Sequence, residues 1–208
     1  MITPMVARLV RDPFDRPSWL FELKWDGFRA IAETDGKGKV DLYSRNHNSF
    51  NERFPVVVQE IAKLKHEVIF DGEVVALDER GFPRFDWLVD RGQEHGTLVY
   101  YVFDLLNLDG KDWRQRPLME RKQRLRGLLD SLRSPRLLYV DHFEGTGRGM
   151  FGWVLGMKME GLVAKDANSP YVEGPRETWH WQKVMNKHYK RQGKVSLGVK
   201  STRDSKLR

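Results

Sequence analysis

Short runs of β-branched and aromatic residues, separated by glycine-containing turns, limit the fold of this chain more than any other feature. Two runs, residues 20–34 and 40–44, are joined by the sequence Asp-Gly-Lys-Gly. Glycine readily adopts the positive φ that tight turns need, so this pair predicts a β-hairpin with Lys24 near its open end. Other strand candidates lie at residues 67–77, 98–106, 136–143, 161–165 and 178–185.

Three other segments have the spacing of amphipathic helices. They are residues 51–64, 118–132 and 149–160. In the second, leucines lie on one side and basic residues mostly on the other, and we expect the basic face around residues 121–126 to be solvated. The glycine-rich residues 145–149 are expected to lead into a helix rather than to bind a phosphate. Because helices and strands do not alternate strictly, the pattern predicts an α+β fold with largely antiparallel sheets flanked by helices.

Charge and cysteine content narrow the class of protein. The 208 residues can bury one substantial core, and the 36 basic against 29 acidic residues give a net charge of +7. Such a balance favours a polyanionic partner, such as nucleic acid. The chain has no cysteine and no apolar run long enough for a signal peptide or a membrane span. We therefore expect a cytoplasmic protein with no membrane contact.

The segment FELKWDGFRA places Lys24, Asp26 and Arg29 close together at the end of an apolar strand. A Lys-x-Asp-Gly string alone is most often an exposed charged turn. Five more charged or aromatic motifs follow it in predicted strands or at their ends. They are LYSRN at 42–46, FDGEVV at 70–75, YYVFDLL at 100–106, EGLVAK at 160–165 and WQKV at 181–184.

This ordered set resembles the covalent nucleotidyltransferase superfamily of ATP-dependent DNA ligases, RNA ligases and mRNA capping enzymes. The opening residues 4–30 and the segment EGLVAKDANSPY are most similar to the ligase domain of bacterial end-joining DNA ligases. The resemblance implies an ATP-grasp-like nucleotidyltransferase (adenylation) domain at residues 1–187. Residues 188–208, which are basic and polar, are expected to form a mobile tail.

The resemblance also implies a reaction. The amine of Lys24 attacks the α-phosphorus of ATP, the resulting AMP passes to the 5′-phosphate of a DNA nick, and the 3′-hydroxyl then displaces it. A lysine amine is nucleophilic only when it is deprotonated, and its usual pKa is about 10.4. The site must therefore supply nearby cations or desolvation, and each step depends on positioning and on charge neutralisation.

Further roles follow from the same resemblance. Glu22 is placed to recognise the adenine amine, and Arg29 lies near the ribose and phosphates. Arg45 grips a phosphate, for which a bidentate guanidinium is suited. Phe103 stacks on adenine, although its periodicity alone indicates a core residue.

Two carboxylates and one lysine complete the implied site. Glu73 contacts the ribose hydroxyls and Glu160 the divalent metal, Mg²⁺ or Mn²⁺, which Glu73 also helps to bind. Taken singly, each glutamate is more simply explained as a solvated strand end. Lys183 binds the α-phosphate.

The last motif departs from the family pattern W-x-K-x-K. Met185 replaces the second lysine if the motif begins at Trp181, whereas a start at Trp179 puts Trp181 and Lys183 at the two lysine positions. Only one lysine remains in either register, so Lys165 or Lys187 could substitute.

The expected partners are nicked or broken double-stranded DNA and a separate OB-fold or end-joining protein, in a nucleoid-associated setting. An OB-fold domain, which needs five strands, is not expected within the chain. Two alternatives stay open. One is an RNA ligase or capping-type nucleotidyltransferase, and the other is a catalytically silent nucleic-acid-binding module.

Overall fold

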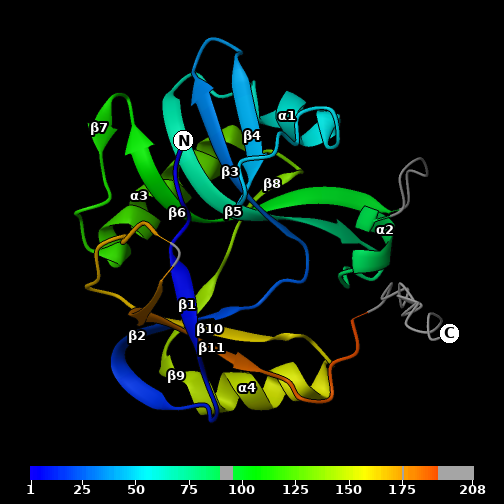
Figure 1. The fold of residues 1–208 in the computed structure, drawn as a ribbon, viewed down its shortest axis with the longest axis vertical. Coiled ribbons are helices and arrows are strands. Elements are labelled where there is room, and N and C mark those ends of the chain that lie inside the picture. Colours follow the sequence, from blue (N-terminus) through cyan, green and yellow to red (C-terminus); the bar gives the residue numbers. More distant parts are fainter. Residues whose placement is uncertain (90–95, 175, 192–208) are drawn as a thin grey trace, which may run out of the picture.

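The computed structural model describes residues 1–89, 96–174 and 176–191, and its strands form two sheets (Figure 1). Sheet A has the order β1-β11-β10-β2-β9, and sheet B the order β4-β3-β5-β6-β7, with β8 paired to β6. Sheet A consists of β1 (Val6–Val10), β2 (Asp15–Leu23), β9 (His142–Thr146), β10 (Gly161–Asp166) and β11 (Glu177–Met185). Sheet B consists of β3 (Phe28–Asp35), β4 (Val40–Ser44), β5 (Glu67–Leu77), β6 (Thr97–Leu108), β7 (Lys111–Asp112) and β8 (Leu137–Tyr139).

Most neighbouring strands are antiparallel, and the exceptions among the described pairs are β1 with β11 and β6 with β8. The helices are α1 (Pro55–Ile61), α2 (Phe85–Val89), α3 (Leu118–Leu132) and α4 (Gly147–Gly156). The predicted α+β class with largely antiparallel sheets is confirmed.

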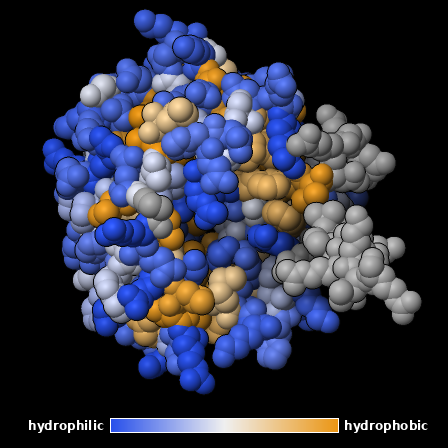
Figure 2. Space-filling view, viewed as in Figure 1, coloured by the Kyte–Doolittle hydropathy of each residue, from blue (hydrophilic) through white to orange (hydrophobic). Residues whose placement is uncertain are grey.

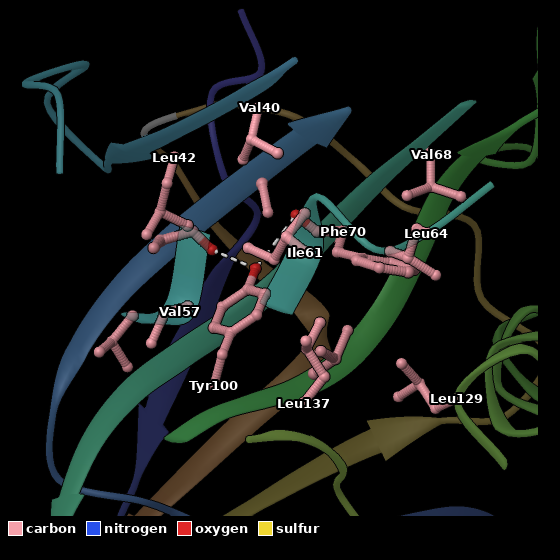
Figure 3. Packing of buried hydrophobic residues seen from close by; sticks show 14 of the residues in the cluster. Val40, Leu42, Val57, Ile61, Leu64, Val68, Phe70, Tyr100, Leu129 and Leu137 are labelled. Carbon is pink, nitrogen blue, oxygen red and sulfur yellow. Dashed lines mark hydrogen bonds between the residues drawn. The ribbon is translucent and has the colours of Figure 1, made fainter. Parts of the chain in front are cut away.

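The largest hydrophobic core lies on one face of sheet B, where α1 and α3 cover it. Figure 3 shows Val57 and Ile61 of α1 and Leu129 of α3 against strand residues of this face. Tyr100 is fully buried within the core, and its hydroxyl donates to the backbone oxygen of Ala30 at 2.9 Å. The hydroxyl therefore has a partner despite its burial.

The opposite face of sheet B meets sheet A through a smaller cluster that includes Ile31, Tyr43 and Trp181. On the outer face of sheet A, Met150 of α4 packs against Phe21 and Leu162. In Figure 1, sheet A and α4 accordingly lie below sheet B. The motif residues of the predicted site thus lie where the inner faces of the two sheets meet.

The prediction of one strand over residues 20–34 is wrong, because the chain changes sheets within it. Strand β2 ends at Leu23 in sheet A, and β3 begins at Phe28 in sheet B. Gly27 permits the crossing, since a Cβ at this position would lie 2.2 Å from the backbone oxygen of Val74. Lys24 therefore lies between the sheets rather than in the β3–β4 hairpin.

The predicted strand over residues 136–143 is divided in the same way, into β8 of sheet B and β9 of sheet A. Apolar residues occur on both sides of each crossing, so the pattern alone does not reveal the crossings. The hairpin turn itself is confirmed, with positive φ at Gly36 and Gly38.

The helix over residues 118–132 is confirmed with the predicted bounds. The other two helices are shorter or shifted: α1 begins at Pro55, a residue favoured in a first helical turn, and α4 begins at Gly147 within the glycine-rich segment. Strand β1 and helix α2 were not predicted. No helix among the described residues is long and apolar enough to cross a membrane.

The expectation of a solvated basic face on α3 is wrong for two of its residues. Arg121 and Lys122 are fully buried, whereas Arg126 is exposed. Arg121 forms a bidentate pair with Asp104 of β6, at 2.7 and 2.8 Å. Each of these buried charges has a partner of opposite charge, which offsets the cost of removing it from water.

The face of the molecule drawn in Figure 2 is mostly hydrophilic, with hydrophobic residues in separate groups.

We expect Asp104→Ala to lower the free energy of unfolding by about 3–5 kcal/mol, because it leaves the buried charge of Arg121 without its carboxylate. Urea denaturation measures the change. The matched control is Asp130→Ala on α3, whose side chain is 70% exposed beside Arg126. This control should stay within about 0.5 kcal/mol. Equal losses in the two variants would contradict the assignment of Arg121 and Asp104 as a buried pair.

Candidate active site

Lys24 is the first residue after β2, at the crossing between the sheets. Its backbone N–H donates to the oxygen of Gly161 at 3.0 Å, which holds it beside the start of β10. Its ammonium nitrogen lies 2.6 Å from Oε2 of Glu160, and the side chain is 24% exposed. Lys24 is thus a partly exposed lysine that contacts a carboxylate, and it is fixed where the chain crosses between the sheets.

Two glutamates, Glu160 and Glu73, interact electrostatically with Lys24. Burial raises the pKa of Glu160, although Lys24 opposes the shift. Burial likewise raises the pKa of Glu73 to about 7, against the attraction of Lys24 and Arg29 and with repulsion from Glu160 and Asp71. Low solvation and like charges therefore make both carboxylates better proton acceptors than free glutamate.

Arg29 is held rigidly on β3, directly opposite Glu73 of β5. Its guanidinium donates to both oxygens of Asp71, at 3.0 and 2.6 Å, and to the backbone oxygen of Met5 at 2.6 Å. Asp71 is fully buried and also accepts from the Tyr171 hydroxyl at 2.7 Å. Burial disfavours the charge of Arg29, but Asp71 keeps its pKa above the usual range. Arg29 therefore presents a permanent positive charge.

Glu22 lies two residues before Lys24, buried between two lysines. Its carboxylate is 2.5 Å from the ammonium of Lys122 on α3 and 2.5 Å from that of Lys165 on β10. Burial alone would raise the pKa of Glu22, but the two lysines outweigh it and lower that pKa. Burial also lowers the pKa of Lys165 to about 8, although Glu22 opposes this. Glu22 is therefore an ionised, firmly held acceptor.

Phe103 of β6 lies on the inner side of sheet B, outside its main core. Its ring meets Trp181 edge-on, with 6.0 Å between the centroids. The ammonium of Lys165 lies 4.3 Å from its centroid, and the guanidinium of Arg29 5.5 Å. Phe103 is thus partly buried against the smaller hydrophobic cluster, as its periodicity indicates, and it also lies beside two charged groups.

Two further residues of the predicted site are Arg45 and Lys183. Arg45 is exposed in the turn after β4 and forms no hydrogen bond or ion pair with the residues that the structure describes. Lys183 of β11 is paired with Val163 of β10. Because alternate strand residues share a face, Lys183 lies on the same face as Trp181. The structure therefore groups Lys24, Arg29, Glu73 and Glu160, and it links Glu22 to Phe103 through Lys165.

The motif analysis did not identify the partners of Asp26. This aspartate is fully buried and accepts a hydrogen bond from the Tyr189 hydroxyl at 2.9 Å and another from Arg191. Arg191 also lies 4.0 Å from Oε1 of Glu160 and 4.0 Å from the ring centroid of Phe85. Tyr189 and Arg191 belong to the predicted tail at residues 188–208. Residues 192–208 lie outside the part of the chain that the structure describes.

The carboxylates fit a divalent metal in one respect. The described residues contain no group of three or more histidine, cysteine, aspartate or glutamate side chains that could hold an ion alone. Mg²⁺, however, usually binds one or two carboxylates together with phosphate oxygens of a substrate. Glu160 and Glu73 provide that donor set beside Lys24.

Comparison with known proteins gives consistent matches. Residues 4–185 match the protein family described as "ATP dependent DNA ligase domain". The chain is 31% identical over 191 residues to the SPbeta prophage-derived DNA ligase-like protein LigB of Bacillus subtilis, which covers 90% of this chain and 68% of that protein. It is 34% identical over 170 residues to the multifunctional non-homologous end joining protein LigD of Mycolicibacterium smegmatis, covering 81% of this chain and 22% of that protein.

Solved structures give the same result. The ligase domain of M. tuberculosis LigD matches with a TM-score of 0.77 and 29% identity, over 88% of this chain and 60% of that chain. A mycobacterial DNA ligase D complexed with ATP and MES matches with a TM-score of 0.75 and 30% identity, over 89% and 60%. The chain thus spans less than two thirds of these structures and about a fifth of the LigD protein.

We expect Glu73→Gln to be more stable than the unsubstituted protein at pH 8, by about 1–2 kcal/mol, and the gain to shrink towards pH 5. The folded pKa of Glu73 is raised from 4.5 to about 7. Its contribution to stability is therefore fully present below pH 4.5 and is lost as the pH rises through 7. Urea unfolding between pH 5 and pH 8 measures this.

The control for loss of a carboxylate is Glu67→Gln, at the exposed start of the same strand. A stability difference for Glu73→Gln that stays constant across this pH range would contradict the low solvation assigned to Glu73.

Proposed function

The chain belongs to the family of ATP-dependent DNA ligase domains, and on that premise we propose that Lys24 is the nucleophile that becomes covalently attached to AMP. The observation that carries the proposal is the 2.6 Å contact of its ammonium with Glu160, at a partly exposed position between the sheets. The nitrogen of Lys24 bonds to the α-phosphorus of ATP, and pyrophosphate leaves. The AMP then passes to the 5′-phosphate of a DNA nick, and attack by the 3′-hydroxyl seals the strand and releases AMP.

Lys24 must lose a proton before it attacks, and Glu160 is the nearest acceptor. Burial raises the pKa of Glu160, which makes the carboxylate a stronger base than a solvated one. Arg29 carries a fixed positive charge near the same carboxylates. Arg29 and Lys24 both oppose the rise in the pKa of Glu73 that burial causes. Cations favour the neutral amine and stabilise the charge that develops on the phosphate.

The remaining roles concern ATP binding. Glu22 accepts a hydrogen bond from the adenine amine, and adenine stacks on Phe103. Glu73 contacts the ribose, and Arg29 lies near the ribose and phosphates. Arg45 and Lys183 bind phosphates, and the exposure of Arg45 leaves its guanidinium available for that task.

A divalent metal, Mg²⁺ or Mn²⁺, would be held by Glu160 and Glu73. When bound, it would neutralise charge on the ATP phosphates. The carboxylates of the chain would hold and orient it, and Glu160 would then serve both the cation and Lys24, whose ammonium lies 2.6 Å from its Oε2.

The proposed substrate is nicked or broken double-stranded DNA, which the net charge of +7 favours. A relative is named for non-homologous end joining, and we propose the same process for this chain, with a separate OB-fold or end-joining protein as partner. The setting is the cytoplasm, at the nucleoid. Residues 1–187 would form the adenylation domain, and residues 188–208 the basic tail.

The two alternatives have less support. RNA ligases and capping enzymes share the covalent step, but the matched family and its relatives are DNA ligases. A silent binding module would not need the nucleophile, both glutamates and the arginine in one cluster.

Incubation with ATP and Mg²⁺ should add the mass of one AMP to the intact protein, and Lys24→Ala should lose at least about 99% of this adduct, because the proposed covalent bond forms on the amine of Lys24. Intact-mass spectrometry measures both. Lys37→Ala, in the exposed β3–β4 turn, is the matched control and should retain the adduct. An adduct of undiminished yield in Lys24→Ala would reject the assignment.

Nicked DNA should be sealed at least about tenfold faster than an RNA nick of the same sequence, and ATP should be used in preference to GTP. Gel separation of labelled strands measures sealing. Faster sealing of RNA would favour the RNA-ligase alternative, and adduct formation with GTP alone would favour the capping-type one.

A further inference from the structure

A row of three buried charges, Lys122–Glu22–Lys165, lies beside the proposed nucleotide site; we call it the Glu22 triad. Oε1 of Glu22 accepts from the Lys122 ammonium at 2.5 Å, and Oε2 lies 2.5 Å from the Lys165 ammonium. No side chain of the triad is more than 3% exposed. The motif-based roles include Glu22 and leave Lys122 without one.

The two lysines have different surroundings. Lys165 lies against two aromatic rings, with its ammonium 4.3 Å from the Phe103 centroid and 4.2 Å from that of Trp181. A base that stacks on Phe103 therefore changes the environment of Lys165. If the base displaces this ammonium, Lys165 no longer holds the carboxylate of Glu22 in one orientation.

Lys122 comes from α3 and contacts no proposed ATP ligand except Glu22. Its ammonium also donates to the backbone oxygen of Val140 at 2.9 Å and lies 4.5 Å from the ring centroid of Tyr139. These partners belong to β8 and to the residue after it, and they do not depend on the nucleotide. Lys122 is therefore anchored independently of ATP.

Burying these charges is costly, and an apolar group of similar size would usually stabilise the fold equally well. An ionised carboxylate has about four acceptor sites, so two lysines leave acceptor capacity free. A carboxylate that is kept ionised and in one orientation can select a base with a donor at the contacted position. This is a function that a merely structural ion pair would not require.

We propose that Lys122 is a positioning residue that holds Glu22 as the acceptor for the exocyclic amine of adenine and thereby sets the preference for ATP. The inference rests on the proposed function, in which Glu22 contacts that amine. Without Lys122, Glu22 retains only Lys165, and it becomes free to turn or to take up a proton when the base disturbs that lysine.

The test compares the rate of adduct formation on Lys24 with ATP and with ITP, which carries an oxygen in place of the 6-amino group. Lys122→Met should lower the preference for ATP over ITP at least about tenfold. Glu22→Gln should lower it as well, and the double variant should resemble Glu22→Gln alone, because Lys122 acts through Glu22. Arg126→Met, an exposed position on the same helix, is the control and should keep the preference.

Lys122→Gln keeps an N–H donor for Val140 but lacks the charge, and it serves if Lys122→Met does not fold. Its preference for ATP should fall at least about threefold. Equal slowing with ATP and ITP, or an undiminished effect of Lys122→Met in the Glu22→Gln background, would overturn the inference. Absence of any adduct with ATP in the unsubstituted protein would instead overturn the proposed function.

Discussion

Lys24 meets Glu160 because the chain leaves sheet A at Leu23 and enters sheet B at Phe28. The four residues between these strands carry the candidate nucleophile, and the bond from its backbone to Gly161 fixes the point of departure. Gly27 is required for the close approach to Val74. The rest of the site follows from this crossing, because it lets carboxylates from both sheets surround one amine.

The interior around the candidate site contains several paired charges. Arg29 with Asp71, Arg121 with Asp104, and the Glu22 triad all have partners at hydrogen-bond distance. Arrangements of this kind contribute little net stability, but removal of one partner is costly. The largest hydrophobic core packs on the other face of sheet B. The inner faces of the two sheets therefore carry the charged residues of the candidate site.

The sequence predicted local structure better than it predicted the sheets. Residues 118–132 were predicted as a helix with correct bounds, because four leucines recur at helical spacing, and glycines marked the β3–β4 turn. The sheet changes at residues 24–27 and near Val140 were missed, since apolar residues occur on both sides of each crossing, as they would in one continuous strand. Lys122 was assigned to a solvated face because charge alone does not reveal a buried partner a hundred residues away in the chain.

The candidate site was predicted from motifs that resemble those of covalent nucleotidyltransferases, so Lys24, Glu73 and Glu160 could be named from the sequence alone. Tyr189 and Arg191 could not, because they lie in a polar stretch with no periodicity. Through these two residues, the polypeptide after β11 contacts the candidate site. Arg191 touches Phe85 on one side of the site, Asp26 two residues from the nucleophile, and the edge of Glu160. A single guanidinium after β11 therefore bridges Asp26, two residues from Lys24, and Glu160, the carboxylate that Lys24 contacts.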